Sequence, residues 1–141
     1  MIMSNDKFKF FEHTADAKFQ AYGKTLPESF SNAALAMMSI MVDYETVENV
    51  ITKEITTKGN DEMAILYNFL EELLFLLDTE GFLLHKVEEI SIDNGKLSAT
   101  VVGDTDIDRY ELLGEVKAVT YNEMEIVEKK DDVMVQVVVD L

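Results

Sequence analysis

Two stretches of the chain repeat apolar residues at helical spacing. The first begins with a capping box, in which Thr25 precedes Glu28 by three residues and Pro27 is tolerated in the first turn. Its apolar positions are Phe30, Ala33, Ala34, Met37, Met38 and Met41. Methionines at this spacing are typical of core packing, so we interpret them as core residues and not as ligands of a cofactor.

The second helical stretch is expected to begin at Asn60, which can act as its N-cap, and to end near Thr79, before Gly81. One apolar stripe is formed by Met63, Leu66, Leu70, Leu73, Leu74 and Leu77, and it is widened by Ile65, Phe69 and Leu76. A helix that is apolar on most of its sides is a buried one. We therefore expect this helix to lie centrally against a sheet.

The remaining segments alternate apolar and polar residues or are rich in Val, Ile and Tyr, as β-strands are. Strands are expected over residues 7–11, 18–23, 50–57, 87–92, 96–102, 115–128 and 133–139. Asn94-Gly95 predicts a tight hairpin, residues 129–132 a second turn, and residues 104–113 an irregular polar loop. This order predicts an α+β fold, a single-domain layered sandwich over residues 1–141 with two helices packed on a largely antiparallel or mixed β-sheet.

The charge of the chain restricts its partners. The 141 residues carry a formal net charge of −16, from 28 acidic and 12 basic side chains. Such a field repels phosphate backbones, because proteins bind nucleic acids mainly by neutralising phosphates with Lys and Arg. The charge disfavours direct binding of RNA or DNA, and it favours metal cations and basic protein surfaces as partners.

The composition also indicates a cellular location. Cysteine is absent, which excludes disulfides and thiolate metal sites. Residues 1–8 lack the basic-then-apolar order of a signal peptide. The longest apolar run, residues 66–77, is interrupted by Glu71 and Glu72 and is too short to span a bilayer. We therefore expect a cytoplasmic protein that does not associate with membranes.

Two aspartates stand at unusual places among the many carboxylates. Asp16 lies in a short polar break between two expected strands, and Asp140 follows three consecutive valines at the end of the last strand, one residue before the terminal carboxylate of Leu141. If the two strand ends lie side by side, carboxylates this close need a counter-charge, and hard oxygen ligands suit calcium, magnesium or manganese. The simpler alternative is that Asp16 caps a turn and Asp140 is an exposed terminal residue.

Other chemistry has less support in the sequence. His13 is the only histidine near Asp16, and without cysteine a zinc site of the usual nitrogen and sulfur kind is not expected. The sequence has no Gly-x-Ser-x-Gly elbow, Walker A loop or Gly-x-Gly-x-x-Gly motif. Lys117 lies in a β-type stretch, where it is either a solvent-facing strand residue or a cation that neutralises a carboxylate cluster or contacts an anionic group.

Several uncommon strings of the sequence resemble a single family. Residues 11–16 (Phe-Glu-His-Thr-Ala-Asp), 21–26 (Ala-Tyr-Gly-Lys-Thr-Leu) and 30–37 resemble the N-terminal signature of archeases. Residues 114–121, followed by Glu123-Met124-Glu125, resemble their second block, and residues 137–141 resemble their C-terminus. The blocks stand in the family's order and cover nearly the whole chain, so the sequence is identified as a member of the archease family.

The resemblance implies a function that composition does not show. Archeases are cofactors of the GTP-dependent tRNA-splicing RNA ligase, which joins a 2′,3′-cyclic phosphate or 3′-phosphate end to a 5′-hydroxyl. They promote guanylylation of the ligase's active-site histidine and its repeated turnover, and they are not themselves catalysts.

The resemblance also implies which residues of this chain act. Asp16, Asp140 and Leu141 would form a metal pocket with calcium as the first candidate, and magnesium or manganese as the others. Lys117, like the two aspartates, would be needed for ligase activation. His13 and Asn122 are candidates for holding the metal ligands in place without contacting the metal themselves.

The sequence departs from the family pattern at two positions. Asn122 stands where the family usually has histidine after Thr-Tyr, and Tyr110 follows Arg109 where the family often has Arg-His. Asn122 can form hydrogen bonds but cannot titrate near neutrality, so no proton-transfer role is expected there.

Two other classes of function remain open at this point. One is a metal-dependent phosphate-ester hydrolase that uses Asp16, Asp140 and His13. The other is a chaperone-like interaction module whose acidic surface only keeps it dissolved.

Overall fold

The computed structural model describes residues 6–141 of the chain, and they form seven strands, two α-helices and two short 3₁₀ helices. In chain order these are β1 (Phe8–Phe11), β2 (Asp16–Gly23), α1 (Leu26–Met41), η1 (Tyr44–Thr46), β3 (Ile51–Lys58), α2 (Glu62–Glu80), β4 (Leu83–Asp93), β5 (Lys96–Asp104), η2 (Ile107–Arg109), β6 (Ala118–Lys129) and β7 (Asp132–Asp140). The expectation of no signal peptide rests mostly on residues 1–5, which lie outside the described residues.

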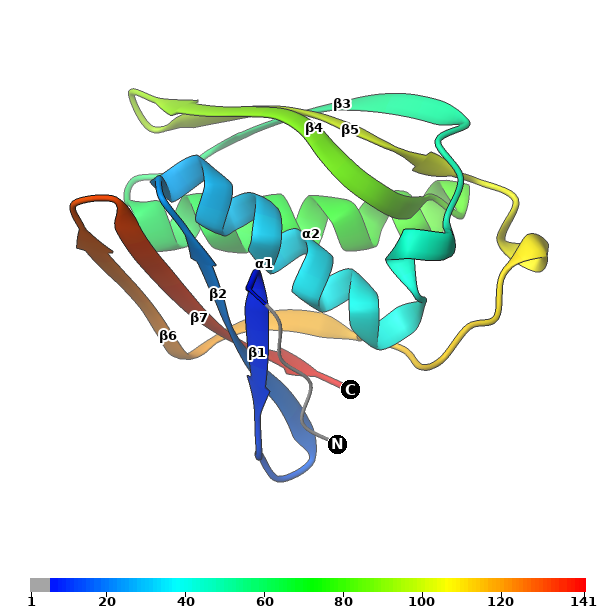
Figure 1. Cartoon of the computed structure of the whole chain (residues 1–141), viewed down its shortest axis with the longest axis horizontal. Coiled ribbons are helices and arrows are strands. Elements are labelled where there is room, and N and C mark those ends of the chain that lie inside the picture. The colour runs from blue at the N-terminus through cyan, green and yellow to red at the C-terminus, as the bar shows by residue number, and fades with distance from the viewer. Residues whose placement is uncertain (1–5) are drawn as a thin grey trace.

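The strands form two antiparallel sheets, and both helices lie in the layer between them (Figure 1). Sheet A has the order β1-β2-β7-β6 and sheet B the order β3-β5-β4. Each helix contacts strands of both sheets. The predicted α+β sandwich is confirmed, with its sheet divided in two, and residues 105–117 carry the chain from sheet B to sheet A along one side of the molecule.

Side-chain caps fix where the two helices begin. Thr25 Oγ1 accepts a hydrogen bond from the Glu28 N–H at 3.2 Å, as the capping box predicts. The prediction that Asn60 caps the second helix is wrong, because Asp61 is the N-cap and its Oδ1 accepts from the Ala64 N–H at 2.8 Å. Asn and Asp cap equally well, but a carboxylate also gains from the positive end of the helix dipole.

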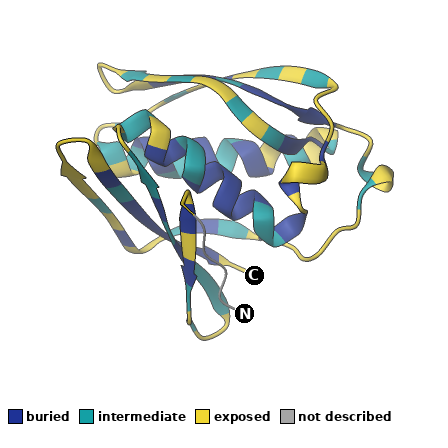
Figure 2. Ribbon diagram, viewed as in Figure 1, coloured by how far each residue is buried: buried dark blue, intermediate teal, exposed yellow. Residues whose placement is uncertain are grey.

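The core fills the layer between the sheets (Figure 2). Met37 and Met38 are fully buried, which confirms that they are core residues. The second helix is buried along Leu66, Phe69, Leu70 and Leu73, as its apolar pattern predicts. Met63 is an exception at 37% exposed, because it lies in the first turn, on the side of the helix shared with the half-buried Tyr67. No helix of residues 6–141 is long and apolar enough to cross a membrane.

Some strand boundaries differ from the sequence pattern. β4 begins at Leu83 and not at residue 87, since the fully buried Leu83 and Leu84 continue the pairing with β5. Asp104 was expected in a loop, but it is the last residue of β5 and is only 3% exposed. β6 begins at Ala118 and not at residue 115.

Candidate functional site

The pairing of β2 with β7 places the two predicted aspartates opposite each other. Asp16 is the first residue of β2, Asp140 is the last residue of β7, and the two are Cα partners in the antiparallel register. Directly opposed residues in such a pair carry their side chains on the same face, with Cβ atoms about 4.5–5.5 Å apart. The two strand ends therefore lie side by side, as the predicted site requires.

A pocket of about 350 Å³ lies beside this end of sheet A. Its polar side is formed by Glu12, His13 and Asp16. Its other lining residues are Phe10, Phe11, Ala17, Ser39, Ile40, Leu113 and Leu141. Asp16 and Leu141 thus line one pocket that is mostly apolar, with its acidic and imidazole groups gathered on the β1–β2 connection.

The carboxylates at this site fit a hard cation in their chemistry and are incomplete in number. In residues 6–141, no three side chains of His, Asp or Glu are gathered closely enough to hold a metal ion by themselves. Asp16 and Asp140 supply two carboxylates, so further ligands would have to come from Leu141, from main-chain oxygens or from water. One more observation fits a cation here: His13 Nδ1 is buried without a hydrogen-bond partner and lies 3.8 Å from Asp16 Oδ2.

The structure brings the backbone of Lys117 to the site but not its side chain. The Lys117 N–H donates to the Asp140 carbonyl at 2.8 Å, which extends the β6–β7 ladder by one bond. The side chain is exposed, and its ammonium forms no ion pair with a carboxylate of the described residues. Lys117 is therefore free to contact a partner, and it does not neutralise the carboxylate pair.

Glu123, which does not stand out in the sequence, links β6 to the β1–β2 connection. Its carboxylate accepts from His13 Nε2 at 2.8 Å and from Lys18 Nζ at 3.1 Å. These two hydrogen bonds lower the pKa of Glu123, with the His13 bond as the larger cause and the Lys18 bond and charge next. The carboxylate therefore stays ionised and remains a strong acceptor.

A β-bulge in β6 gives Glu123 this reach. Thr120 pairs with Val138 and Glu125 with Gln136, so residues 121–124 of β6 all lie opposite one residue of β7. Glu123 has a positive φ of 54° within this bulge. The sequence carries one sign of it: the buried positions change from odd to even numbers between Val119 and Met124, which a regular strand cannot do.

A polar network continues from the bulge along the outer face of sheet A. Gln136, only 6% exposed, donates to the Glu123 carbonyl at 2.8 Å and accepts from Gln20 Nε2 at 3.0 Å. Tyr22 donates in turn to Gln20 Oε1 at 3.0 Å. The buried amide of Gln136 thereby fixes the bulge that carries Glu123.

The two positions that depart from the family pattern lie in different surroundings. Asn122 is exposed in the bulge, where its N–H donates to Thr120 Oγ1 at 3.2 Å. Tyr110 donates to the buried Asp104 Oδ2 at 2.5 Å, and its oxygen accepts from the Glu48 N–H at 3.1 Å. Tyr110 therefore serves the connection between the sheets, and only Asn122 belongs to the strand that borders the carboxylates.

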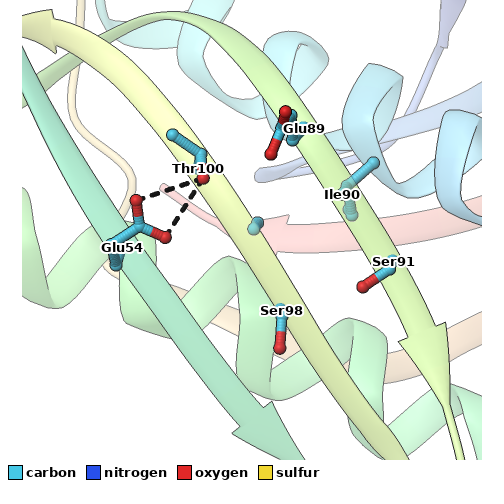
Figure 3. A pocket seen from close by; sticks show the side chains of 7 residues that line it. Glu54, Glu89, Ile90, Ser91, Ser98 and Thr100 are labelled. Atoms are coloured by element: carbon cyan, nitrogen blue, oxygen red, sulfur yellow. Dashed lines mark hydrogen bonds between the residues drawn. The ribbon is translucent and has the colours of Figure 1, made fainter.

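Another hollow, of about 410 Å³, lies on the outer face of sheet B (Figure 3). It is lined by Glu54, Glu89, Ile90, Ser91, Ser98, Ala99 and Thr100. The Thr100 hydroxyl donates to both oxygens of the Glu54 carboxylate at 3.1 Å, as the dashed lines show. This carboxylate is satisfied by a neighbouring strand, and among the described residues neither serine is hydrogen-bonded to a carboxylate or a histidine, so the face has the chemistry of a solvated sheet surface.

The fold and the site together define a small acidic α+β protein with paired carboxylates where its last strand ends, and comparisons with known proteins give it a family. The sequence model of the Archease protein family matches residues 8–141. Protein archease of Methanosarcina barkeri is 38% identical over 146 residues, and the alignment covers 100% of both chains. The chain belongs to the archease family.

Solved structures support this assignment. The solution structure of protein 1598 of Methanobacterium thermoautotrophicum has a TM-score of 0.84 and 38% identity, and the match covers 97% of this chain and 100% of that one. The crystal structure of a Thermotoga maritima archease, described as a possible chaperone, has a TM-score of 0.65 over 93% and 94% of the two chains. At 20% identity, this second likeness shows the fold alone.

Proposed function

We propose that this chain is a non-catalytic protein cofactor of the GTP-dependent tRNA-splicing RNA ligase, and that it acts through a divalent cation bound at Asp16 and Asp140. The observation that carries the proposal is the pairing of these two aspartates across β2 and β7, beside an open pocket, in a member of the archease family. The proposed role is to promote guanylylation of the ligase and its repeated turnover.

The cation would be held by the carboxylates of Asp16 and Asp140 together with the carboxylate of Leu141. These are hard oxygen donors, which suit calcium first and magnesium or manganese as alternatives. When bound, the cation would neutralise the carboxylates and supply a positive centre for a phosphate or nucleotide group of the partner. The chain's own residues fix where that centre stands, because the β2–β7 register holds both aspartates at one sheet end.

The charge and surface of the molecule suit a basic protein partner. A ligase that binds RNA must carry Lys and Arg for the phosphates, and a chain of net charge −16 is steered toward such a surface. Leu112, Leu113 and Leu141 are 54%, 58% and 42% exposed. Leu113 and Leu141 also line the pocket, so an apolar contact area lies beside Asp16.

The geometry supports binding more than hydrolysis. Ser39, the pocket's hydroxyl, donates to the Ala36 carbonyl at 2.6 Å and is thereby held against its own helix. His13 is held by Glu123. The described residues of the pocket thus do not pair a nucleophile with a base, as an activated nucleophile requires.

The direct test is single-turnover guanylylation of the cognate ligase, with and without this protein, at matched divalent metal. We expect a large acceleration that Asp16→Ala and Asp140→Ala each reduce at least tenfold. Asp93→Ala removes the same charge from an exposed site in sheet B and should keep the acceleration.

Each contrary result points to a different function. Normal stimulation by both Asp16→Ala and Asp140→Ala would refute the proposed site. Phosphate-ester turnover by the purified protein alone would favour a hydrolase. A chaperone-like module would be favoured if the protein does not stimulate the ligase but prevents its aggregation, and if Asp16→Ala and Asp140→Ala prevent aggregation equally well.

A further inference from the structure

The His13 ring is held between two carboxylates, those of Glu123 and Asp16. Because the Glu123 carboxylate can only accept, His13 Nε2 must carry the hydrogen of their 2.8 Å bond. In the neutral ring Nδ1 then has a free lone pair. That atom is buried, has no hydrogen-bond partner, and lies 3.8 Å from Asp16 Oδ2. An electron pair beside a carboxylate is unfavourable unless a positive charge lies close to both, either a proton on the ring or a bound cation.

Backbone strain is concentrated at the same place. Among residues 6–141, four non-glycine residues have positive φ: Ala15, Asn94, Glu123 and Asp131. Asn94 and Asp131 lie in two-residue hairpin turns, where this conformation is required. Ala15 precedes Asp16 directly, and Glu123 holds His13, so the other two strained residues are both at the candidate site. Strain of this kind persists only where the surrounding structure fixes it.

We propose that Glu123 is a positioning residue of the carboxylate pocket, which holds the His13 ring beside Asp16 and thereby fixes the direction of the Asp16 carboxylate toward a cation bound there. This inference rests on the proposed function, since it names a residue that prepares the proposed cation site. Glu123 acts through His13 and does not itself touch the cation. Carboxylates that ligate a metal are commonly held in direction by partners of this kind, which do not touch the metal themselves.

The contacts explain why Glu123, among many carboxylates, has this role. The β1–β2 connection is attached to the rest of sheet A at Asp16, through its pairing with Asp140, and again at His13 and Lys18, through Glu123. Without the second attachment, residues 12–15 would be anchored only at their two strand ends. The position of the Asp16 carboxylate within the pocket would then be set by one contact instead of two.

The test is the affinity of the purified protein for a divalent cation, measured by titration calorimetry with Mn²⁺ and with Ca²⁺. We expect Glu123→Ala to weaken binding by roughly 10- to 100-fold, which is the usual cost of losing a residue that holds the ligands of a metal in place. Glu125→Ala is the matched control: it removes the same charge from the same bulged strand, contacts Gln136 and not His13, and should bind within twofold of the unsubstituted chain.

A conservative variant separates positioning from general stability. The amide oxygen of Glu123→Gln can still accept from His13 Nε2, so this variant should recover at least half of the lost binding free energy at a temperature well below the Tm of every variant. Nitrogen NMR of the His13 ring adds a second readout. Mn²⁺ should broaden the Nδ1 signal in the unsubstituted protein and in Glu123→Gln far more than in Glu123→Ala.

The outcomes distinguish this inference from the proposed function. Cation binding that Glu123→Ala leaves unchanged, or that Glu125→Ala weakens equally, would overturn the role of Glu123 and leave the proposed function standing. Absence of Mn²⁺ and Ca²⁺ binding by the unsubstituted chain would overturn the metal part of the proposed function, and this inference with it.

Discussion

Two carboxylates of this protein have similar partners and opposite consequences. Asp104 accepts from the Tyr110 hydroxyl, the Asp106 N–H and the Arg109 guanidinium, and it is 3% exposed. Glu123 accepts from His13 and Lys18, and its side chain is 44% exposed. Hydrogen bonds lower the pKa of both groups, from Tyr110 first in one case and from His13 first in the other.

The difference lies in what each cluster leaves unsatisfied. Around Asp104 every partner is used: Arg109 also binds Glu48, and the Tyr110 oxygen accepts from the Glu48 N–H. Around Glu123 the His13 ring still has a buried nitrogen without a partner, directed at Asp16. A polar cluster in which every group has a partner, here called closed, stabilises a fold. A cluster with an unsatisfied group, here called open, can bind a ligand at that group. We therefore expect the Asp104 cluster to control stability and the Glu123 cluster to control binding.

Removing Asp104 should give the largest loss of stability. In Asp104→Ala three donors lose a charged acceptor together, and the connection from sheet B to sheet A loses its anchor, so Tm should fall by roughly 10 °C in thermal unfolding. The folded fraction should bind cations with unchanged affinity. A tenfold weaker cation affinity at a temperature where the variant is folded would contradict the separation of the two clusters.

Removing only the Tyr110 hydroxyl should have a smaller effect of the same kind. Tyr110→Phe keeps the ring but deletes the donor to Asp104 and the acceptor for the Glu48 N–H. The loss of a charge-assisted bond is worth about 1.5–3 kcal/mol, so Tm should fall by roughly 4–10 °C, less than in Asp104→Ala. Phe11→Tyr is the control variant: it adds a hydroxyl to a half-buried ring outside the Asp104 cluster, and its Tm is compared with that of Tyr110→Phe. An unchanged Tm in Tyr110→Phe would show that the cluster does not hold the connection.

The comparison also shows how far sequence reasoning reaches. Apolar spacing predicts both helices and the order of elements along the chain, because burial of a regular face gives the sequence a periodic pattern. It does not predict that the sheet divides in two, since both sheets cover the same pair of helices and have the same alternation. The caps show the same limit: Asn60 and Asp61 are adjacent and both are good N-cap residues, so sequence alone does not choose between them.

Only the part of the candidate site that lies at the strand ends could be predicted from the sequence. Asp16 and Asp140 stand out in the sequence because Asp16 lies in a short polar break between two expected strands and Asp140 ends an apolar strand. Glu123 does not stand out, because its role depends on a bulge that lets it reach past β7 to His13. The change of parity between Val119 and Met124 marks such a bulge but does not say which of its side chains faces the β1–β2 connection.

Asp104 should contribute to the dependence of stability on pH. Its pKa is lowered in the folded state, so its stabilising effect is present above its unfolded pKa, near 4, and is lost as pH falls through the lower folded value. Asp104→Asn cannot titrate there, so the stability difference from the unsubstituted protein should be constant above about pH 5 and should shrink below about pH 4. Urea unfolding from pH 3 to 7 measures this. A difference that grows on acidification would contradict the assignment.

The smallest expected effect is that of Lys117→Ala on cation binding. The ammonium of Lys117 forms no ion pair among residues 6–141, and only its N–H reaches Asp140, a bond that alanine keeps. Cation affinity should therefore stay within twofold, while ligase activation should fall if the exposed side chain contacts the partner. Lys130→Ala, in the β6–β7 turn, removes the same charge away from the site and should change neither quantity. A tenfold change of cation affinity in Lys117→Ala would mean that Lys117 belongs to the cation site, and that the open cluster is larger than the contacts of Glu123 and His13 define.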